Sequence, residues 1–435
     1  MCKPRDPPSA SSDNLQCDRL ARYPARSSFE HSQEGAVRFV VSKEPSLSDR
    51  YHPRVLVRSL PLESGNYGGL LQAYALQQAL LVLGTNPMAD RADRFDKYSS
   101  KRLKEAARRV IVALGYRNPG WLTRIARDAD RRGVATFADR HIRSVPLYVS
   151  RQRVDAALVD SFDAFIVGSD QVWRRRYADP RPNLFEFLEP DDGRPRFSYA
   201  ASFGRDDIDD YGAGLIAQTA ELAQRLTAIS VREASGVDLV WKNWALRAQQ
   251  LIDPTFLVEP ERYISLASTA VDPQPQGRVI DYVLDDNPAA RRTVNGIMNH
   301  LGDASFSLLP PTPRSYWDFR RHREQFRRPS VEAWLGAIGS ARFVITDSFH
   351  GTALSIIHHV PFVSILNPFR GAARLESLMD LFGLEDRIVE AGAAIPAAVV
   401  DRSIDWDRVD ATIERERERA TVYLCRALSG DRSWH

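Results

Sequence analysis

The stretch ARFVITDSFHGTALSIIHHVPFVSIL, residues 341–366, predicts a strand, a short helix and a second strand. Residues 343–345 are a β-branched and aromatic run, typical of a buried parallel strand, and residues 361–365 form a similar run. Residues 352–357 between them indicate a short apolar helix, preceded by small polar residues that can cap it. Two strands joined by a helix form a βαβ unit, which predicts an α/β fold with a parallel sheet.

His350 lies at the start of this helix, just past the carboxyl end of the first strand. Ligands of open α/β sheets bind at such positions, where free N–H groups and the helix dipole favour an anion. An imidazole can add a hydrogen bond, a positive charge or a proton. The alternative is a structural histidine that caps or packs, as most polar residues near helix starts do. Polar residues elsewhere in the chain help to decide between a ligand-binding and a structural histidine.

Polar residues also follow other predicted strands. The strand at 54–58 leads into a glycine-bearing loop, residues 61–69, and the helix 70–83. The strand at 162–167 is followed by GSDQVW, and the runs 197–204 and 228–233 end on small polar or charged residues. Such groups are costly to bury without partners. Their recurrence at strand ends predicts a ligand-binding cleft.

Composition limits the classes of protein that fit. The chain has 435 residues, enough for two domains, and 43% hydrophobic with 26% charged residues is typical of a soluble globular protein. A formal net charge of +3 gives little support for nucleic-acid binding. Cys2, Cys17 and Cys425 show neither zinc-ligand nor disulfide spacing. Without an apolar run of membrane-spanning length or a signal-peptide core, the sequence predicts a cytoplasmic protein.

The chain divides into a tail and two α/β domains. Residues 1–50 lack periodicity and predict a mobile tail, followed by a first domain at 51–260. A Pro- and Gln-rich stretch ending at Gly277 crosses to a second domain at 278–435, which closes with a charged helix at 406–427. Its loop at 367–371 carries Arg370, which we expect to reach the cleft.

Two segments, 102–132 and 314–328, are rich in arginine, and the second interleaves aromatic residues in SYWDFRRHREQFRR. Solvated helix faces are the simplest interpretation. The alternative is a patch for an anionic acceptor or for membrane headgroups. A nucleic-acid surface is a minority interpretation, because no recognised module accompanies the basic run.

Seven segments carry a resemblance to a known family: GNYGGLLQAYALQ (65–77), DAFIVGSDQVW (163–173), SYAASFG (198–204), ISVRE (229–233), IDPTFL (252–257), ITDSFHGTALSI (345–356) and RLESLMDLFGLEDRI (374–388). With these segments in family order, the chain resembles the polysaccharide pyruvyl transferases. The resemblance implies two Rossmann-like domains facing across a cleft, as in GT-B glycosyltransferases. It also implies transfer of pyruvate from phosphoenolpyruvate to a pair of hydroxyls on a cell-surface or exopolysaccharide glycan, as a ketal.

The resemblance places phosphate binding on Arg232 and His350. The chemistry also needs an acid and a base, for which His350, Asp170 and Asp347 are the candidates, with helix capping as the alternative for Asp347. We expect the first domain to face the acceptor and the second to face the donor. The remaining predicted substrate-binding residues are Asn66, Tyr67, Ser169, Trp173, Ser348, Gly351, Thr352 and Arg370.

Phosphoenolpyruvate is the expected donor, and no metal or other cofactor is expected. The expected acceptor is a sugar or a lipid-linked oligosaccharide, with peripheral contact at the inner face of the membrane and no nucleic-acid partner. A GT-B glycosyltransferase that uses a nucleotide sugar is the main alternative, since its domain plan would be the same. A non-catalytic sugar- or phosphate-binding protein is more distant, because it would not require the proton-transfer groups.

Overall fold

The computed structural model describes residues 52–62, 66–91, 98–116, 118, 120–122, 125, 131–150, 153–272, 274–367, 371–393, 395 and 397–432. The predicted tail at 1–50 and the predicted ligand Arg370 lie outside these residues. Cys425 forms no disulfide bond with any described residue, and Cys2 and Cys17 fall outside the described part. Among the described residues, no helix is both long and apolar enough to cross a bilayer.

The first half of the chain forms a parallel sheet. Its strands are β1 (Arg54–Arg58), β2 (Asn86–Asp90), β3 (Ser144–Val145), β4 (Ala164–Val167) and β5 (Arg196–Ser198). They lie in the order β3-β2-β1-β4-β5, and the apolar central strands β1 and β4 are almost wholly buried. The short pair β6 (Ser230–Val231) and β7 (Gln249–Gln250) continues the sheet through parallel bridges, Phe197 to Ala228 and Ala201 to Val231. The strand order reverses between β1 and β4, as in a Rossmann fold.

The second half forms another parallel sheet. Its strands are β8 (Val279–Tyr282), β9 (Ser305–Ser307), β10 (Phe343–Thr346), β11 (Phe362–Leu366) and β12 (Ile388–Glu390). The order is β12-β11-β10-β8-β9, so the strand order reverses between β8 and β10. The predicted βαβ unit is confirmed as β10, a helix and β11, which pair in parallel. In open α/β sheets, the point of reversal is where the loops part and a ligand can enter.

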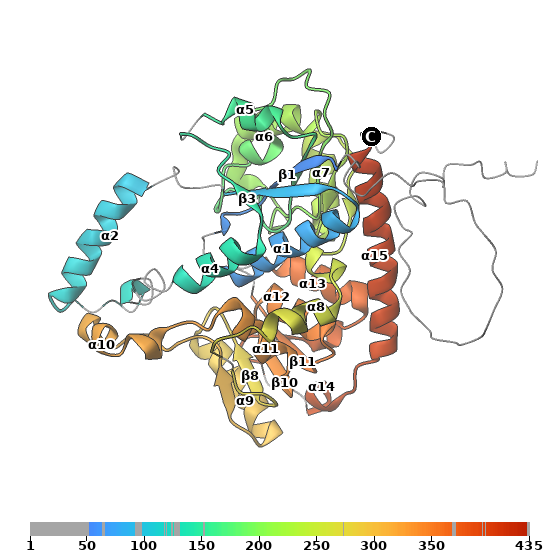
Figure 1. Cartoon of the computed structure of the whole chain (residues 1–435). Helices are drawn as coiled ribbons and strands as arrows, with labels where there is room; N and C mark the ends of the chain where they lie inside the picture. Colours follow the sequence, from blue (N-terminus) through green and yellow to red (C-terminus); the bar gives the residue numbers. More distant parts are fainter. Residues whose placement is uncertain are drawn as a thin grey trace, which may run out of the picture.

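Helices cover both sheets (Figure 1). Those of the first half are α1 (Tyr67–Val82), α2 (Tyr98–Ala113), α4 (Arg131–His141), α5 (Ala156–Asp160), α6 (Gly212–Ala223) and α7 (Ala234–Trp244). Those of the second half are α8 (Pro260–Ala267), α9 (Pro288–Leu301), α10 (Tyr316–Arg321), α11 (Val331–Gly339), α12 (Phe349–Ile357), α13 (Ala372–Phe382), α14 (Ala397–Asp401) and α15 (Trp406–Leu428).

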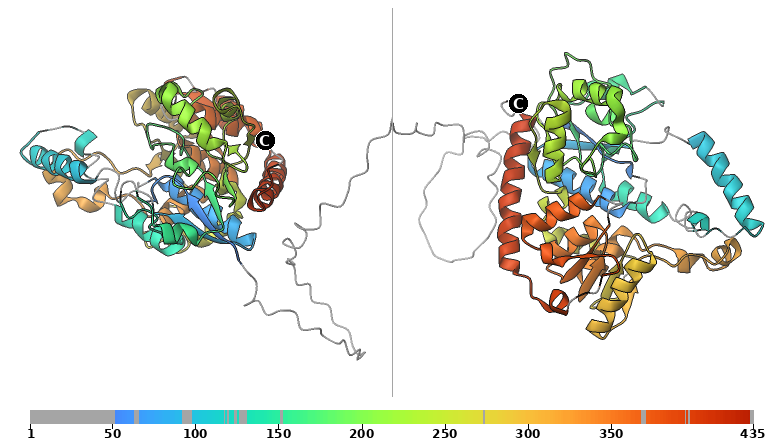
Figure 2. Two further views of the ribbon diagram at one scale, coloured as in Figure 1. Left: turned by 90° about the horizontal axis from the view of Figure 1, so that it is seen from above. Right: turned by 180° about the vertical axis from the view of Figure 1, so that it is seen from behind.

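Helix α15 runs along both halves of the molecule (Figures 1 and 2). Its first turns bury Val409 and Ile413 in a core that is built largely from the second half of the chain. Its last turns bury Tyr423 against the first sheet, and the Tyr423 hydroxyl donates a hydrogen bond of 2.8 Å to the carbonyl oxygen of Ser198. Helix α15 therefore packs against both domains and links the second to the first.

The two domains share an apolar core. Tyr67 of α1 packs against Trp334 of α11, with ring centroids 5.3 Å apart, and Trp334 packs against Tyr282 of β8 at 5.7 Å. These rings belong to one continuous cluster that includes α12 and the loop before α8. An interface of this kind holds the two sheets in a fixed relation, because separating them would expose large aromatic surfaces to water.

Two local predictions differ from the structure. Helix α1 begins at Tyr67, whereas the glycines of GNYGG predicted a loop as far as residue 69. Both glycines lie in the first turn: the His350 ring leaves no room for a Cβ at Gly68, and a Cβ at Gly69 would lie 3.1 Å from the side chain of Asn66, the N-cap of the same helix. Strand β2, NPMAD, contains Pro87 and was not predicted, because a proline normally argues against a strand.

Candidate active site

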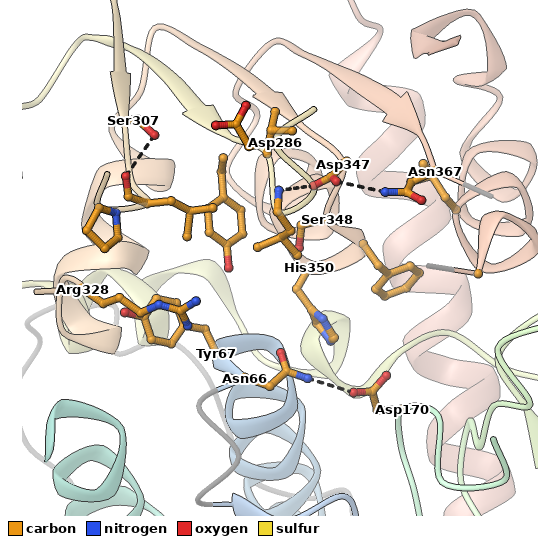
Figure 3. Close-up of a pocket in the computed structure, with 18 of the residues that line it drawn as sticks. Asn66, Tyr67, Asp170, Asp286, Ser307, Arg328, Asp347, Ser348, His350 and Asn367 are labelled. Carbon is orange, nitrogen blue, oxygen red and sulfur yellow. Dashed lines mark hydrogen bonds between the residues drawn. The ribbon is translucent and has the colours of Figure 1, made fainter. Parts of the chain in front are cut away.

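A cavity of about 870 Å³ lies at the points of strand reversal in both sheets. Its walls come from the loops after β1 and β4 of the first domain and after β8 and β10 of the second (Figure 3). The predicted fold, two Rossmann-like domains facing across a cleft in a GT-B-like arrangement, is confirmed. The residues that line the cavity include Asn66, Tyr67, Asp170, Tyr282, Arg328, Asp347, Ser348, Phe349, His350 and Arg374.

His350 occupies the first turn of α12, on the wall of this cavity. Ser348 is the N-cap, and its hydroxyl accepts the N–H of Gly351 at 3.3 Å. The N–H groups of Phe349 and His350 have no acceptor within the helix, as in every first turn, and the helix dipole favours an anion in front of them. The expected position of His350 at an anion-favouring helix end is therefore confirmed.

The His350 ring is confined on two sides. A Cβ on Gly68 would lie 2.0 Å from its Nδ1 atom, so only glycine fits opposite the ring. Its Nε2 atom is buried without a hydrogen-bond partner and lies 3.8 Å from the Oδ2 atom of Asp253. Burial lowers the pKa of His350, although the carboxylates of Asp253 and Asp170 act to raise it. In the free protein the imidazole is therefore neutral at neutral pH.

A buried ionic cluster lies behind His350. Arg232 donates from Nη1 to Asp253 at 2.6 Å and from Nη2 to Asp170 at 3.1 Å, and its guanidinium stacks on Phe349 at 4.4 Å. Arg374 of α13 donates to the same Oδ1 atom of Asp170 at 3.2 Å. Two arginines and two aspartates thus compensate one another inside the protein, which offsets the large cost of burying each charge alone.

Asp170 connects this cluster to the cavity. Its backbone has a φ of 71°, and its Oδ2 atom accepts the Asn66 amide at 3.2 Å (Figure 3). Burial acts to raise the pKa of Asp170, but Arg232, Arg374 and His350 together lower it to about 2. A carboxylate with so low a pKa is a weak proton acceptor at neutral pH. The geometry therefore favours Asp170 as a fixed negative charge more than as a general base.

Asp347 lines the cavity but has a different local role. Its Oδ1 and Oδ2 atoms accept the backbone N–H groups of Leu284 and Asp285 at 2.6 and 3.0 Å. It does not cap α12, which is capped by Ser348. The carboxylate ties the loop after β8 to the end of β10, so the structure favours a structural role over proton transfer. The catalytic role of Asp347 stays a prediction.

Four other predicted ligands do not line the large cavity. Trp173 is buried between Phe203 and Trp244, where its large indole ring completes the first-domain core, and its contact with substrate stays a prediction. Thr352 is buried and bonds to Ser364, and Gly351 packs on Thr346. Both residues pack inside the βαβ unit, and their direct contacts with substrate stay predictions.

Ser169 is buried beneath the site, where its hydroxyl lies 3.3 Å from Asp253. Arg232 also lies behind the wall of the large cavity, in a smaller pocket of about 60 Å³ that shares Phe349 and Arg374 with it. The arginine that reaches the large cavity beside His350 is Arg374. Direct contact between Arg232 and a donor stays a prediction.

Three residues of the site, Asp253, Arg374 and Gly68, were not predicted from the sequence. Asp253 and Gly68 lie within the quoted segments IDPTFL and GNYGG, but their roles depend on contacts with His350 from the other domain. Arg374 had a readable signal. It precedes Leu378 by four residues on the apolar face of α13, where an arginine is costly unless it has a partner.

The described residues contain no group of three or more His, Cys, Asp or Glu side chains placed to hold a metal ion. The polar groups of the cavity include helix N–H groups, an imidazole, guanidiniums, hydroxyls and amides, together with the carboxylates of Asp170, Asp286 and Asp347. Such groups suit a small anion and a polyhydroxyl compound. Fold and site together define an α/β protein that binds substrates between two Rossmann-like domains.

Comparison with known proteins narrows this class. The family model of the polysaccharide pyruvyl transferases matches residues 66–368, which include α1 and all elements up to β11. The chain belongs to the polysaccharide pyruvyl transferase family and is therefore a transferase. The matched region includes Asp170, Asp253 and His350 but stops before Arg374. No curated protein matches the chain.

Solved structures with a related architecture include a UDP-glucosyltransferase from Polygonum tinctorium, 14% identical, which covers 88% of this chain and 99% of its own with a TM-score of 0.37. A UDP-GlcNAc 2-epimerase from Neisseria meningitidis is 7% identical over 86% and 99%, with a TM-score of 0.44. A trehalose-6-phosphate synthase is 12% identical over 86% and 99%, with a TM-score of 0.47. At these TM-scores the likeness carries no argument about the substrate.

Proposed function

We propose that this transferase moves the pyruvyl group of phosphoenolpyruvate onto two hydroxyls of a glycan, forming a cyclic ketal. The observation that carries the proposal is the position of His350. It lies in the first turn of α12 on the cavity wall, within a helix end that favours phosphate and beside Arg374. Membership of the family supports the transferase chemistry and a glycan acceptor.

The reaction requires several groups in a fixed order. A proton adds to the methylene carbon of phosphoenolpyruvate, and the adjacent carbon becomes cationic, stabilised by the oxygen that carries the phosphate. One sugar hydroxyl attacks this carbon and loses its proton. Phosphate then leaves with the C–O bonding electrons, and a second hydroxyl attacks, losing its proton as the ring closes. The protein must hold two anionic groups, position two hydroxyls and transfer protons.

His350 and α12 meet the first requirement. The N–H groups of the first turn and the imidazole face the phosphate, and Arg374 supplies a second cation for the phosphate or the carboxylate. An anion at close range raises the proton affinity of the imidazole, so binding the donor protonates His350. The imidazolium then supplies a proton to the departing phosphate. Asp253, 3.8 Å from Nε2, stabilises this charged form.

The acceptor faces the first domain in this proposal. Asn66 and Tyr67 at the start of α1 line the cavity, as do the aromatic rings of Tyr177, Tyr282 and Phe326. Aromatic rings with a polar edge suit the apolar faces and hydroxyl rims of sugars. The acceptor is a sugar or a lipid-linked oligosaccharide of a cell-surface or exopolysaccharide glycan, and the reaction takes place on the cytoplasmic side.

A glycosyltransferase that uses a nucleotide sugar is the second candidate, because the two-domain plan fits both donors. Donor-dependent stabilisation separates them. A ligand present at a hundredfold excess over its Kd stabilises a native protein by about 2.7 kcal/mol, which raises the unfolding temperature. We expect phosphoenolpyruvate to raise it and UDP-sugars to leave it unchanged. Stabilisation by a UDP-sugar alone would assign the chain to the second candidate.

A further inference from the structure

Helices α2 and α10 project from the body of the molecule as an arm (Figures 1 and 2). We define the arm as residues 98–116 and 314–327. Its two segments come from different domains but share a small apolar core, in which Val112 of α2 meets Phe319 of α10 and Phe326. The indole N–H of Trp317 donates to the carbonyl oxygen of Ala113 at 3.2 Å and fastens the segments together. The two segments of the arm therefore pack against each other around an apolar core of their own.

The arm nevertheless exposes large apolar side chains to water. Leu114 is 83% exposed and Trp317 is 64% exposed, and Val110, Ile111 and Tyr116 are exposed beside them in the chain. Leu114 directly follows the end of α2, and its N–H donates to the carbonyl oxygen of Val110 at 2.9 Å, so the two side chains lie on the same side of the helix. The indole N–H of Trp317 already has a hydrogen-bond acceptor within the arm, so the exposed ring needs no further polar partner. Exposed apolar groups gathered in one place mark an interaction surface.

The sequence of these segments is also strongly basic. The sequence of α2 contains five basic residues against one glutamate, and residues 314–328 contain six arginines against one aspartate and one glutamate. The whole chain has a formal net charge of only +3, so the remainder is net acidic. Arg109 and Arg321 are exposed on the two halves of the arm. Basic residues around tryptophan and leucine match an interface with anionic lipid headgroups above and acyl chains below.

The arm adjoins the mouth of the active-site cavity. The segment that carries α10 lines the cavity on both sides of the helix, with Leu309 and Pro310–Pro313 before it and Phe326 and Arg328 after it. Figure 3 shows Arg328 extended over Tyr67 at this end of the cavity. A surface held by the arm would therefore lie next to the opening through which an acceptor enters.

We propose that the arm docks on an anionic lipid bilayer, with the Leu114 and Trp317 side chains in the interface and the arginines at the headgroups. Docking is independent of pyruvyl transfer. Only its consequence, presentation of a lipid-linked acceptor to the cavity, rests on the proposed function. Membrane binding by itself therefore tests the docking proposal, whatever the donor of the transferase is.

The test is co-sedimentation of the full chain with phosphatidylcholine vesicles that contain increasing amounts of phosphatidylglycerol. We expect binding that rises with phosphatidylglycerol and falls with salt. Each basic residue near such a surface contributes a factor of about five, so the double variant Arg109→Gln/Arg321→Gln should bind roughly 30-fold more weakly. Trp317→Ser should also bind more weakly. Trp241→Ser is the matched control, because Trp241 is 60% exposed on α7, outside the arm, and its loss should leave binding unchanged.

A second measurement reports insertion directly. Brominated acyl chains should quench part of the protein's tryptophan fluorescence, and Trp317→Phe, which keeps an aromatic ring, should remove the quenched part. No binding to anionic vesicles, binding independent of lipid charge, or equal weakening by Trp241→Ser would overturn the proposal. Tighter binding to DNA or to an acidic polysaccharide, without quenching by brominated lipid, would assign the arm to that partner instead.

Discussion

At the scale of single residues, the site depends on the imidazole of His350, and the groups around it shift its pKa in opposite directions. Burial lowers the pKa of His350, whereas the Asp253 and Asp170 carboxylates raise it. Gly68 leaves room for the ring and fixes its position. The residue is therefore neutral in the free protein and ready to take up a proton when a dianionic phosphate arrives.

The first prediction follows from this balance. At pH 7.5 the binding of phosphoenolpyruvate should be accompanied by proton uptake, because the free imidazole has a pKa below 6.5 and the bound phosphate raises it. Calorimetry in buffers of different ionisation enthalpy measures this uptake. His350→Gln should abolish it and, if His350 protonates the leaving phosphate, should lower kcat about 100-fold or more. Equal proton uptake in the native and variant chains would contradict the prediction.

The second prediction concerns Gly68. In Gly68→Ala the new methyl group would lie 2.0 Å from Nδ1 of His350, so the ring must move. We expect a folded protein whose kcat/KM for phosphoenolpyruvate falls by at least tenfold, on the order of 1.4 kcal/mol of transition-state stabilisation. Gly296→Ala in α9 is the control, because nothing lies within 4 Å of its added Cβ. A fully active Gly68→Ala enzyme would show that the ring position does not matter.

At the scale of elements, the site is assembled by loops that follow parallel strands. The loop after β4 delivers Asp170, the end of β6 delivers Arg232, and α13 delivers Arg374. The two arginines share the Oδ1 atom of Asp170 but differ in position, since only Arg374 reaches the large cavity. We therefore expect Arg232 to have a structural role and Arg374 to bind substrate.

The third prediction tests this division. Arg232→Gln leaves two buried aspartates short of a cation, so the free energy of unfolding should fall by roughly 3–5 kcal/mol. Arg374→Gln should mainly weaken donor binding, by roughly 1.5–3 kcal/mol, the scale of a charge-assisted hydrogen bond. Urea denaturation and calorimetry measure the two effects. Arg419→Gln, a half-exposed arginine near the small pocket, controls for the loss of charge. The division fails if both variants affect only stability.

Much of this arrangement could be predicted from sequence, and the failures have local causes. The βαβ unit around His350 was predictable because apolar strands flank a capped apolar helix. The start of α1 was not, because GNYGG has the composition of a loop and the need for glycine at position 68 comes from His350 of the other domain. The burial of Trp173 in the core was not predicted, because an aromatic residue after a strand suits a sugar and a core equally well. Asp253 requires tertiary structure, since its contacts with Arg232 and His350 span both domains.

At the scale of the whole molecule, the two domains are joined by an apolar interface and by α15. Trp334 lies between Tyr67 of the first domain and Tyr282 of the second, and the last turns of α15 pack on the first sheet. The walls of the cavity therefore have a fixed spacing. This rigidity suits a site that must align one small donor with two hydroxyls of an acceptor.

The fourth prediction is that the domains unfold together. Urea denaturation followed by tryptophan fluorescence and by far-UV circular dichroism should give one coincident transition. Trp334→Ala should lower the free energy of unfolding by about 3–5 kcal/mol, because it removes the ring shared by both domains. Trp241→Ala, an exposed control, should change it by less than about 0.5 kcal/mol. Two separated transitions in the native chain would show that the domains fold independently.

The most direct test of the central claim is mass spectrometry of candidate glycans incubated with the enzyme and phosphoenolpyruvate. We expect a glycan product that is heavier than the acceptor by one pyruvic acid minus one water, and the release of one phosphate for each pyruvyl group added. The same product should be nearly absent with His350→Gln and absent when a UDP-sugar replaces phosphoenolpyruvate. Transfer of a sugar from the UDP-sugar, without any pyruvyl product, would contradict it.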